Sequence, residues 1–181
     1  MNSERSIGRM NRHETVVSVV NELMEVSKKA PCKKTLQKIV YLIEEAGGPK
    51  KFDYTIHFYG PYSADLDFEI QKLTEVGYLF INYTDSGHLI EPTEEAKAHG
   101  ISKLPAEEKQ IVNLFGKESP SSLELLATTL FVQRETKATD YGSILPGVKK
   151  IKGSKYSDSQ IQTAVKKLHF RTHLKAERIT Q

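Results

Sequence analysis

Hydrophobic positions in the first quarter of the chain recur at helical spacing in two segments. From about Asn11 to Val26, apolar side chains repeat at three- and four-residue intervals, and Pro31 ends the segment. The same spacing returns over roughly residues 35–46 and stops at the Gly-Gly-Pro of residues 47–49. The pattern therefore predicts two amphipathic helices, each with a broad buried stripe.

Alternation of apolar and polar positions replaces this spacing over residues 52–59. The alternation predicts a strand in which Phe58 points into the core. Gly60 and Pro61 are expected to break that strand in a tight turn, and Ser63 to cap a third helix. The buried stripe of that helix is expected to consist of Leu66, Ile70 and Leu73.

Two short strands follow, over residues 78–84 and 88–91, with Phe80 expected in the core. The Asp-Ser-Gly between them is a good hairpin turn, because Gly87 tolerates a positive φ. Thr93 is expected to cap a short helix. The order helix, helix, strand, helix, strand, strand is typical of a winged helix, a three-helix bundle with a two-stranded wing. We therefore expect an α+β, mainly α protein with a winged-helix-like N-terminal domain over residues 1–102.

Residues 103–181 are predicted to form a helical C-terminal subdomain with a basic tail. Pro105 and the Ser-Pro of residues 119–120 each begin a helical pattern. The glycines and the proline within residues 137–156 predict a looser segment, and a last helix is expected from about Ser159 to Leu168 or beyond.

Composition bears on the cellular location of the protein and on whether it has a membrane partner. Cys32 is the single cysteine of the 181 residues, so no internal disulfide can form and a cytoplasmic location is expected. No apolar run approaches the length that a membrane span needs, and the N-terminal residues lack the apolar region of a secretory signal. We therefore expect no membrane partner.

Two neighbouring motifs carry a family resemblance. The helical stretch KTLQKIVYLIEEAG (residues 34–47) is followed by HFYGPYS (residues 57–63). Together they resemble the YwgA-like proteins and, more distantly, the Panacea (SocA-like) domain, over roughly residues 15–100. The chain lacks the tryptophans usual in Panacea domains and has YGPYS where those domains more often have YGPV, which favours the YwgA-like branch. The matching residues are Leu36, Gln37, Lys38, Val40, Tyr41, Tyr59, Gly60 and Pro61.

The Panacea resemblance implies an antitoxin-like protein that neutralises a toxin by direct contact. We therefore expect a non-enzymatic protein-interaction module, antitoxin-like or regulatory, with a protein partner such as a toxin. The sequence leaves the oligomeric state undetermined, and a homodimer is one of the alternatives. An alternative is that Tyr41 packs beneath the YGP corner and Gln37 hydrogen-bonds a turn carbonyl, so that these residues serve the fold. The candidate partner-binding residues are Gln37, Lys38, Tyr41, Tyr59, Gly60, Pro61 and Tyr62.

A DNA-binding transcriptional regulator is the alternative function. The helix before the wing, the usual recognition helix, carries four carboxylates and one lysine, which opposes docking of that helix on phosphates. Cations gather elsewhere, around the second helix and over residues 148–181. The latter segment contains nine Lys and Arg but two Asp and Glu. The candidate nucleic-acid contacts are Lys28, Lys29, Lys33, Lys34, Lys149, Lys150, Lys152, Lys166 and Lys167.

Catalytic and metal motifs are weak. The sequence has no P-loop, GxGxxG, GxSxG or HExxH motif. Cys32 has no base beside it in sequence, although His57 could approach it in space. His169 and His173 are spaced as a ligand pair but lack two further ligands. We therefore predict no catalytic residue, metal or cofactor, and an enzyme with an unrecognised site is the third alternative.

Overall fold

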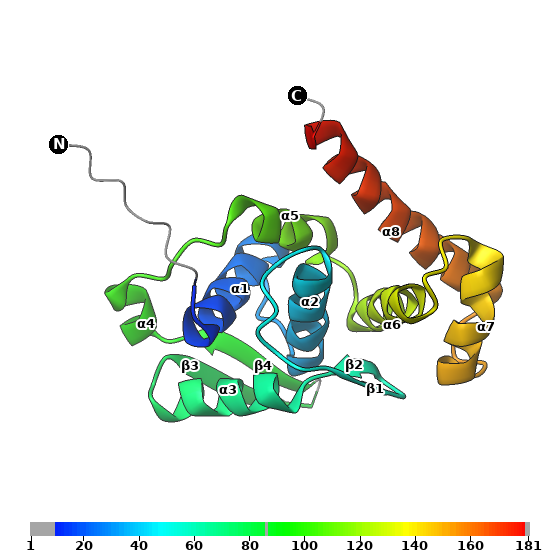
Figure 1. Cartoon of the computed structure of the whole chain (residues 1–181). Coiled ribbons are helices and arrows are strands. Elements are labelled where there is room, and N and C mark those ends of the chain that lie inside the picture. Colours follow the sequence, from blue (N-terminus) through cyan, green and yellow to red (C-terminus); the bar gives the residue numbers. More distant parts are fainter. Residues whose placement is uncertain (1–9, 86, 180–181) are drawn as a thin grey trace.

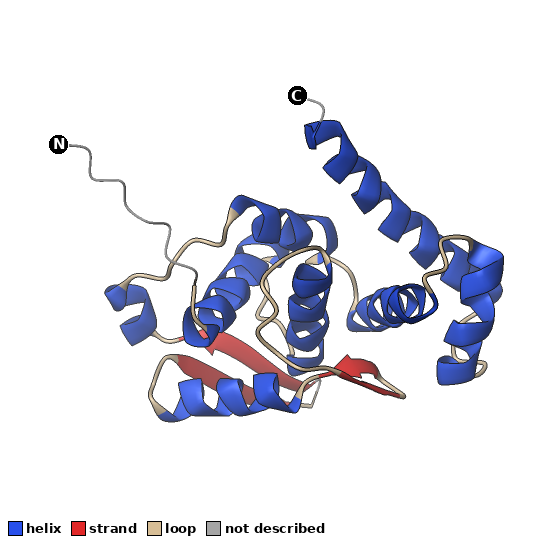
Figure 2. Ribbon diagram, in the orientation of Figure 1, coloured by secondary structure: helices blue, strands red, loops and turns tan. Residues whose placement is uncertain are grey.

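The structure, a computed structural model, describes residues 10–85 and 87–179. Helices make up most of it, with two small antiparallel hairpins between them (Figures 1 and 2). This is the α+β, mainly α class that the sequence predicts. In chain order the elements are α1 (Arg12–Ser27), α2 (Lys33–Glu45), β1 (Thr55–His57), β2 (Gly60–Tyr62), α3 (Ala64–Glu75), β3 (Leu79–Thr84), β4 (Gly87–Pro92), α4 (Glu94–His99), α5 (Ala106–Phe115), α6 (Pro120–Thr136), α7 (Tyr141–Lys152) and α8 (Asp158–Ile179).

The N-terminal half has a winged-helix-like arrangement of α1, α2 and α3 with the β3–β4 hairpin. Capping residues begin the helices where the sequence predicts: the Asn11 side chain accepts a hydrogen bond from the Glu14 amide, and the Ser63 hydroxyl accepts one from the Leu66 amide. The residues before α2 extend the wing, because Cys32 bridges to Leu89 in β4. This third strand-like contact was not predicted from the sequence.

The predicted strand over residues 52–59 is wrong in its bounds. Thr55–His57 forms β1, residues 58 and 59 form the turn, and Gly60 and Pro61 lie in β2 rather than in the turn. Gly60 pairs with His57 and Pro61 with Ile56. The expected core positions of Phe58 and Phe80 are also wrong, since their side chains are 54% and 57% exposed. Alternation cannot distinguish one strand from a tight hairpin whose turn contains two aromatic residues.

The loose segment predicted over residues 137–156 is instead largely the helix α7. The Asp140 side chain caps this helix by accepting a hydrogen bond from the Ser143 amide, 2.9 Å away. Pro146 lies inside the helix. Ile144 and Val148 are fully buried, and a Cβ at Gly147 would lie 2.5 Å from Val132 of α6. Close packing against α6 therefore outweighs the helix-breaking tendency of one proline and two glycines.

The C-terminal helices pack directly on the N-terminal half. α6 lies beside α2 and β2, and α7 and α8 pack on α6 (Figure 1). Buried apolar residues from both halves form one core cluster, from Val16 of α1 to Leu168 of α8. The division at residues 102 and 103 stays a prediction. Within the described part of the chain, no helix combines the length and apolar character required to cross a membrane.

Candidate functional site

Two aromatic residues form the tip of the β1–β2 hairpin. Phe58 and Tyr59 are 54% and 62% exposed, although the neighbouring Gly60 and Pro61 are buried. The two rings meet edge to face, with centroids 5.4 Å apart. The hairpin therefore presents a paired aromatic surface rather than contributing those rings to the core.

Buried polar side chains of α2 hold the hairpin where it leaves β2. The Gln37 amide donates to the carbonyl oxygen of Ser63 at 2.8 Å and accepts from the Ser63 amide at 3.0 Å. The Nζ atom of Lys38 donates a hydrogen bond to the carbonyl oxygen of Pro61, at 2.6 Å. Gln37 and Lys38 are 3% and 2% exposed. These bonds tie the main chain of residues 61 and 63 to α2, and the Ser63 carbonyl oxygen also accepts a hydrogen bond from the Asp67 amide of α3. The end of the hairpin is therefore held against α2.

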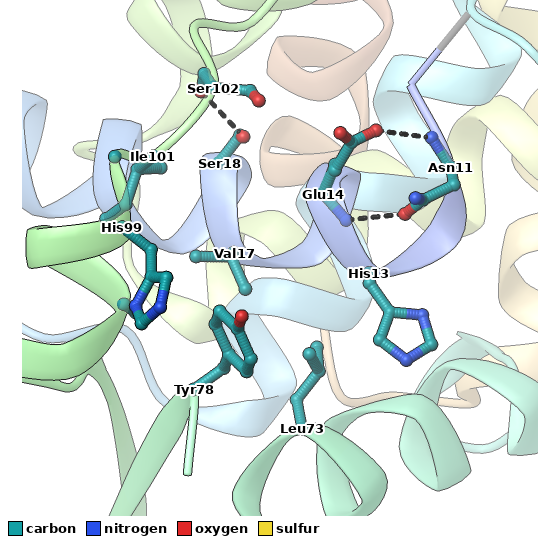
Figure 3. Close-up of a pocket in the computed structure, with 12 residues that line it drawn as sticks. Asn11, His13, Glu14, Val17, Ser18, Leu73, Tyr78, His99, Ile101 and Ser102 are labelled. Atoms are coloured by element: carbon teal, nitrogen blue, oxygen red, sulfur yellow. Dashed lines mark hydrogen bonds between the residues drawn. The ribbon is translucent and has the colours of Figure 1, made fainter. Parts of the chain in front are cut away.

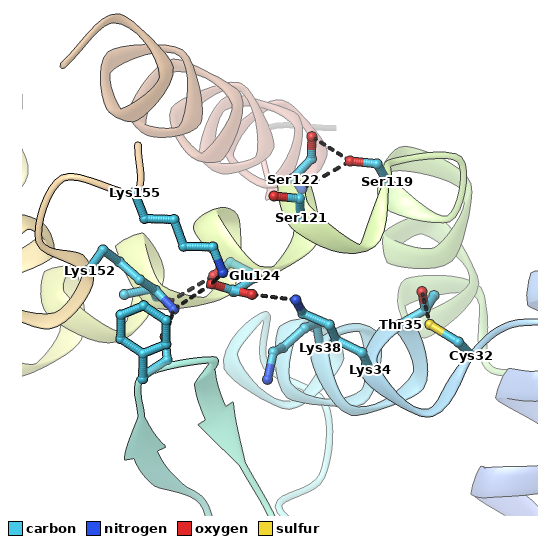
Figure 4. Close-up of polar contacts among 12 residues, drawn as sticks. Cys32, Lys34, Thr35, Lys38, Ser119, Ser121, Ser122, Glu124, Lys152 and Lys155 are labelled. Atoms are coloured by element: carbon cyan, nitrogen blue, oxygen red, sulfur yellow. Dashed lines mark hydrogen bonds and ion pairs between the residues drawn. The ribbon is translucent and has the colours of Figure 1, made fainter. Parts of the chain in front are cut away.

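A second support comes from a buried carboxylate on α6. Glu124 accepts a hydrogen bond from Lys152 at 2.9 Å and one from Lys155 at 2.7 Å, both through Oε1. Lys34 of α2 forms an ion pair with the other carboxylate oxygen. Lys152 also donates to the carbonyl oxygen of Phe58. Figure 4 shows Lys34 reaching Glu124 from one side and the two C-terminal lysines from the other. We call Lys34, Lys38, Lys152, Lys155 and Glu124 the lysine–glutamate cluster.

The lysine–glutamate cluster holds more positive than negative charge. Burial would raise the pKa of Glu124, but hydrogen bonds from Lys155, Lys34 and Lys152 outweigh burial and lower that pKa to about 2. Burial, together with the repulsion of Lys152, lowers the pKa of Lys38 to about 8. Burial likewise lowers the pKa of Lys152, against the attraction of Glu124. Four ammonium groups thus share one ionised carboxylate.

The cluster also lies against the rings of the hairpin tip. The ammonium nitrogen of Lys155 is 5.3 Å from the ring centroids of both Phe58 and Tyr59. That of Lys34 is 5.4 Å from the Tyr59 centroid. These are distances at which a cation is attracted to an aromatic face. The site therefore combines a supported turn, two exposed rings and two lysines over the ring faces.

The predicted partner-binding residues divide into two groups in the structure. Tyr59 is exposed, and Tyr62 is half-buried with its ring 5.7 Å from that of His57. Of these residues, Tyr59 and Tyr62 are the ones that a partner could reach. Gln37 makes the turn hydrogen bond that the sequence analysis offered as an alternative, and Tyr41 packs edge to face on Tyr54. The buried members, which support the hairpin from within, are Gln37, Lys38, Tyr41, Gly60 and Pro61.

Sequence reasoning missed Glu124, Lys155 and the exposure of Phe58. The signal for Glu124 was a single carboxylate within the apolar run LELLATTLF, where a charge requires a buried partner. The partners come from residues 34, 152 and 155, which no local spacing relates to residue 124. Only the tertiary packing brings them together.

The candidate nucleic-acid lysines differ in exposure and in their partners, and Lys152 is buried. Lys34 and Lys152 are engaged with Glu124, while Lys33 pairs with Asp67 at 2.5 Å and Lys149 with Asp158 at 2.8 Å. Lys28 lies 3.6 Å from Glu25, and Lys167 contacts Glu118. The exposed members are Lys28, Lys29, Lys150, Lys166 and Lys167. DNA binding through these faces stays a prediction.

A separate cavity of about 510 Å³ opens between α1, α4 and the end of α3 (Figure 3). The His13 ring nitrogen Nδ1 lies 2.6 Å from a carboxylate oxygen of Glu69, and the His99 Nδ1 lies 2.9 Å from the carbonyl oxygen of Glu95. The Ser18 hydroxyl donates to a main-chain carbonyl. The enzyme alternative requires such a cavity. The contacts described there do not pair a nucleophile with a base, and that alternative stays a hypothesis.

The remaining catalytic and metal-ligating candidates from the sequence are Cys32, His57, His169 and His173. The Cys32 sulfur lies 3.4 Å from the Thr35 hydroxyl, and the His57 ring contacts Thr55 and Tyr62. His169 is partly buried, while the side chain of His173 lies outside the described residues. Among the residues whose side chains are described, no group of three or more His, Cys, Asp or Glu is arranged to hold a metal ion.

Fold and site together define a mainly helical protein with a winged-helix-like half and an aromatic hairpin tip on a lysine–glutamate cluster. No protein-family model matches the chain. The chain is similar to the uncharacterized protein YwgA of Bacillus subtilis, with 27% identity over 129 residues, covering 67% of this chain and 75% of YwgA. This similarity supports the YwgA-like resemblance of the sequence motifs.

Proposed function

We propose that this chain is a non-enzymatic protein-interaction module that binds a protein partner through the β1–β2 hairpin tip. The observation that carries the proposal is the pair of rings at this tip, Phe58 and Tyr59, which are 54% and 62% exposed on a hairpin held by buried side chains. Because the chain more distantly resembles the Panacea domain, whose partner is a toxin, we propose an antitoxin-like or regulatory role.

Rigidity is what makes these rings suited to binding. Binding costs conformational entropy when side chains and loops become ordered. Here Lys152 holds the main chain within the tip, at Phe58, and Lys38 and Gln37 hold it just after the tip, at residues 61 and 63. Aromatic side chains have few rotatable bonds and bury a large area, and they are frequent at the centres of interfaces. The hairpin tip therefore offers contact area at low entropic cost.

Photo-crosslinking tests the proposal. A photoreactive amino acid replaces Tyr59 in one variant and Tyr83 in another. Tyr83 is a matched control because it is a tyrosine, 72% exposed, near the tip of the wing hairpin. We expect position 59, but not position 83, to crosslink to a discrete partner in cells of the host. Mass spectrometry identifies that partner, which is then purified for binding measurements.

Calorimetry with the purified partner gives the decisive comparison. We expect Phe58→Ser combined with Tyr59→Ser to weaken binding at least about tenfold, and Tyr83→Ser to leave it unchanged. Both variants should keep a stability within about 1 kcal/mol of the unsubstituted protein, since these side chains are exposed. Equal affinities of the folded variants for the partner would refute the proposal.

A further inference from the structure

The charge around the hairpin tip indicates what kind of partner it binds. We propose that the partner contributes an acidic segment, with a carboxylate seated between Lys34 and Lys155 beside the ring of Tyr59. This inference rests on the proposed function and specifies the chemistry of the partner at the same site.

The first argument is the incomplete neutralisation of the lysine–glutamate cluster. Its four lysines have one carboxylate among them, that of Glu124. Acidic groups on the surrounding helices are engaged with other cations: Asp67 with Lys33, and Asp158 with Lys149. Like charges held together raise the free energy of the folded state. A further carboxylate at the cluster would relieve that repulsion.

The second argument is which part of the cluster a partner can reach. The side chains of Lys152 and Glu124 are 0% exposed, whereas those of Lys34 and Lys155 are 33% and 30% exposed. These two reachable ammonium groups are also the ones close to the Tyr59 ring, at 5.4 and 5.3 Å. A carboxylate placed there would be partly desolvated against the rings, which strengthens its attraction to both lysines. The exposed rings would pack on apolar side chains flanking the acidic residue.

The third argument separates an acidic protein segment from a nucleic acid. Exposed rings beside lysines could also stack bases, but a nucleic-acid groove needs a track of cations along the phosphates. The chain instead continues from the hairpin into α3, whose first turn carries Asp65 and Asp67. Lys33 offsets Asp67, while Asp65 lies 3.8 Å from Arg12 and remains half exposed. Two reachable cations beside a hairpin that leads into an acidic helical turn suit one or two acidic side chains rather than a polyanionic strand.

The test uses the isotopically labelled protein and three probes. One is a synthetic peptide of about twelve residues that alternates Glu or Asp with Leu; the second replaces every acid by Gln or Asn; the third is an oligo-dT of about twelve nucleotides. We expect the acidic peptide to shift the NMR signals of Phe58 and Tyr59, and the shifts to weaken as NaCl rises from about 0.05 to 0.5 M. The neutral peptide should leave them unchanged. Equal binding of the neutral peptide, tighter binding of oligo-dT at these residues, or no shift with the acidic peptide overturns the inference.

Two pairs of substitutions provide the matched control. Lys34→Gln with Lys155→Gln removes the two reachable cations, and Lys103→Gln with Lys166→Gln removes two exposed lysines elsewhere. We expect the first pair to lower the affinity for the acidic peptide at least about fivefold and the second pair to leave it within about twofold. If the first pair fails to fold, the salt dependence and the neutral peptide decide the matter on the unsubstituted protein.

The same variants distinguish the two proposals. If the crosslinked partner binds unsubstituted protein and the Lys34 and Lys155 variant equally well, but not the Phe58 and Tyr59 variant, the acidic-segment inference fails and the proposed function stands. If the Phe58 and Tyr59 variant binds that partner normally, the proposed function itself fails.

Discussion

The ammonium nitrogen of Lys152 lies 2.9 Å from a carboxylate oxygen of Glu124, and neither side chain is exposed to solvent. This contact joins α7 to α6, and through the second hydrogen bond of Lys152 it reaches the carbonyl oxygen of Phe58. The C-terminal helices therefore help to shape the hairpin tip, which lies almost a hundred residues earlier in the chain. A buried ion pair adds little net stability, but removing one partner leaves an uncompensated buried charge.

The first prediction concerns the loss of that carboxylate. Glu124→Gln leaves Lys152 buried without a counter-charge, so we expect a loss of about 3–5 kcal/mol in the free energy of unfolding. Urea denaturation followed by circular dichroism measures it. The control is Glu118→Gln, which removes a surface partner of Lys167 and should cost less than about 1 kcal/mol. Similar losses in the two variants would contradict the special role of the buried site.

The second prediction is a pH dependence that arises from Glu44. Burial raises the pKa of this carboxyl group to about 7, partly offset by a hydrogen bond from the Lys51 amide, from an ordinary value of 4.5. Between these two values the unfolded chain releases the proton before the folded chain does. The contribution of Glu44 to stability therefore falls as pH rises from 4.5 to 7, and the full penalty remains above pH 7.

Glu44→Gln keeps an acceptor for the Lys51 amide and removes the titrating group. We expect the variant to be more stable than the unsubstituted protein at pH 8, by roughly 1–3 kcal/mol, and the difference to vanish near pH 4. Urea denaturation of both proteins across this range measures the difference, in which the titrations of all other groups largely cancel. A difference that does not change with pH would count against the raised pKa.

The third prediction concerns the amide that ties α2 to the hairpin. Gln37→Leu keeps the side-chain volume but leaves the buried Ser63 amide without its acceptor, while the Ser63 carbonyl oxygen keeps its hydrogen bond from the Asp67 amide. We expect a loss of about 1–3 kcal/mol, the cost of one buried unsatisfied group. Gln71→Leu, on the exposed face of α3, is the matched control and should change the free energy of unfolding by less than about 0.5 kcal/mol. Hydrogen exchange at the Ser63 amide should speed up in the first variant alone.

Features that depend on local sequence were predicted well. Side-chain caps such as Asn11, Ser63 and Thr93 act within three residues, so the sequence alone places the starts of α1, α3 and α4. The buried stripe of α3 and the wing hairpin follow from helical spacing and from one turn glycine.

Features that depend on tertiary packing were not predicted. Pro146 indicates a loop by its local preference, yet α7 forms because Ile144 and Val148 fill space against the core. Phe58 resembles a core residue by its hydrophobicity, but the turn directs it outward. Glu124 acquires its role from lysines in two distant segments. For α7 and Glu124 the deciding contacts lie far away in sequence, whereas for Phe58 the decision rests on which residues form the turn.

The fourth prediction compares two glycines that have the same positive φ. Gly60 and Gly100 both have φ of 86°, and a residue with a Cβ held in such a sparsely populated region costs about 1–3 kcal/mol. Their surroundings differ: a Cβ at Gly60 would lie 2.8 Å from the Thr128 hydroxyl, whereas one at Gly100 would meet no atom within 4 Å. Gly100→Ala should therefore cost only the backbone term, and Gly60→Ala about 1–3 kcal/mol more because of overpacking.

Thr128→Ala separates the steric part of this difference. The Thr128 hydroxyl donates to the carbonyl oxygen of Glu124 in its own helix, so its removal frees the space that an added methyl group at residue 60 requires. In the Gly60→Ala background, Thr128→Ala should recover part of the lost stability, while in the Gly100→Ala background it should recover none. Urea denaturation is measured for the unsubstituted protein and Thr128→Ala, and for each glycine variant with and without Thr128→Ala. These six proteins give both coupling energies. Equal coupling at the two glycines would mean that β2 does not pack on α6 as closely as the structure shows, and the hairpin tip would then lack the rigid base from which its function is proposed.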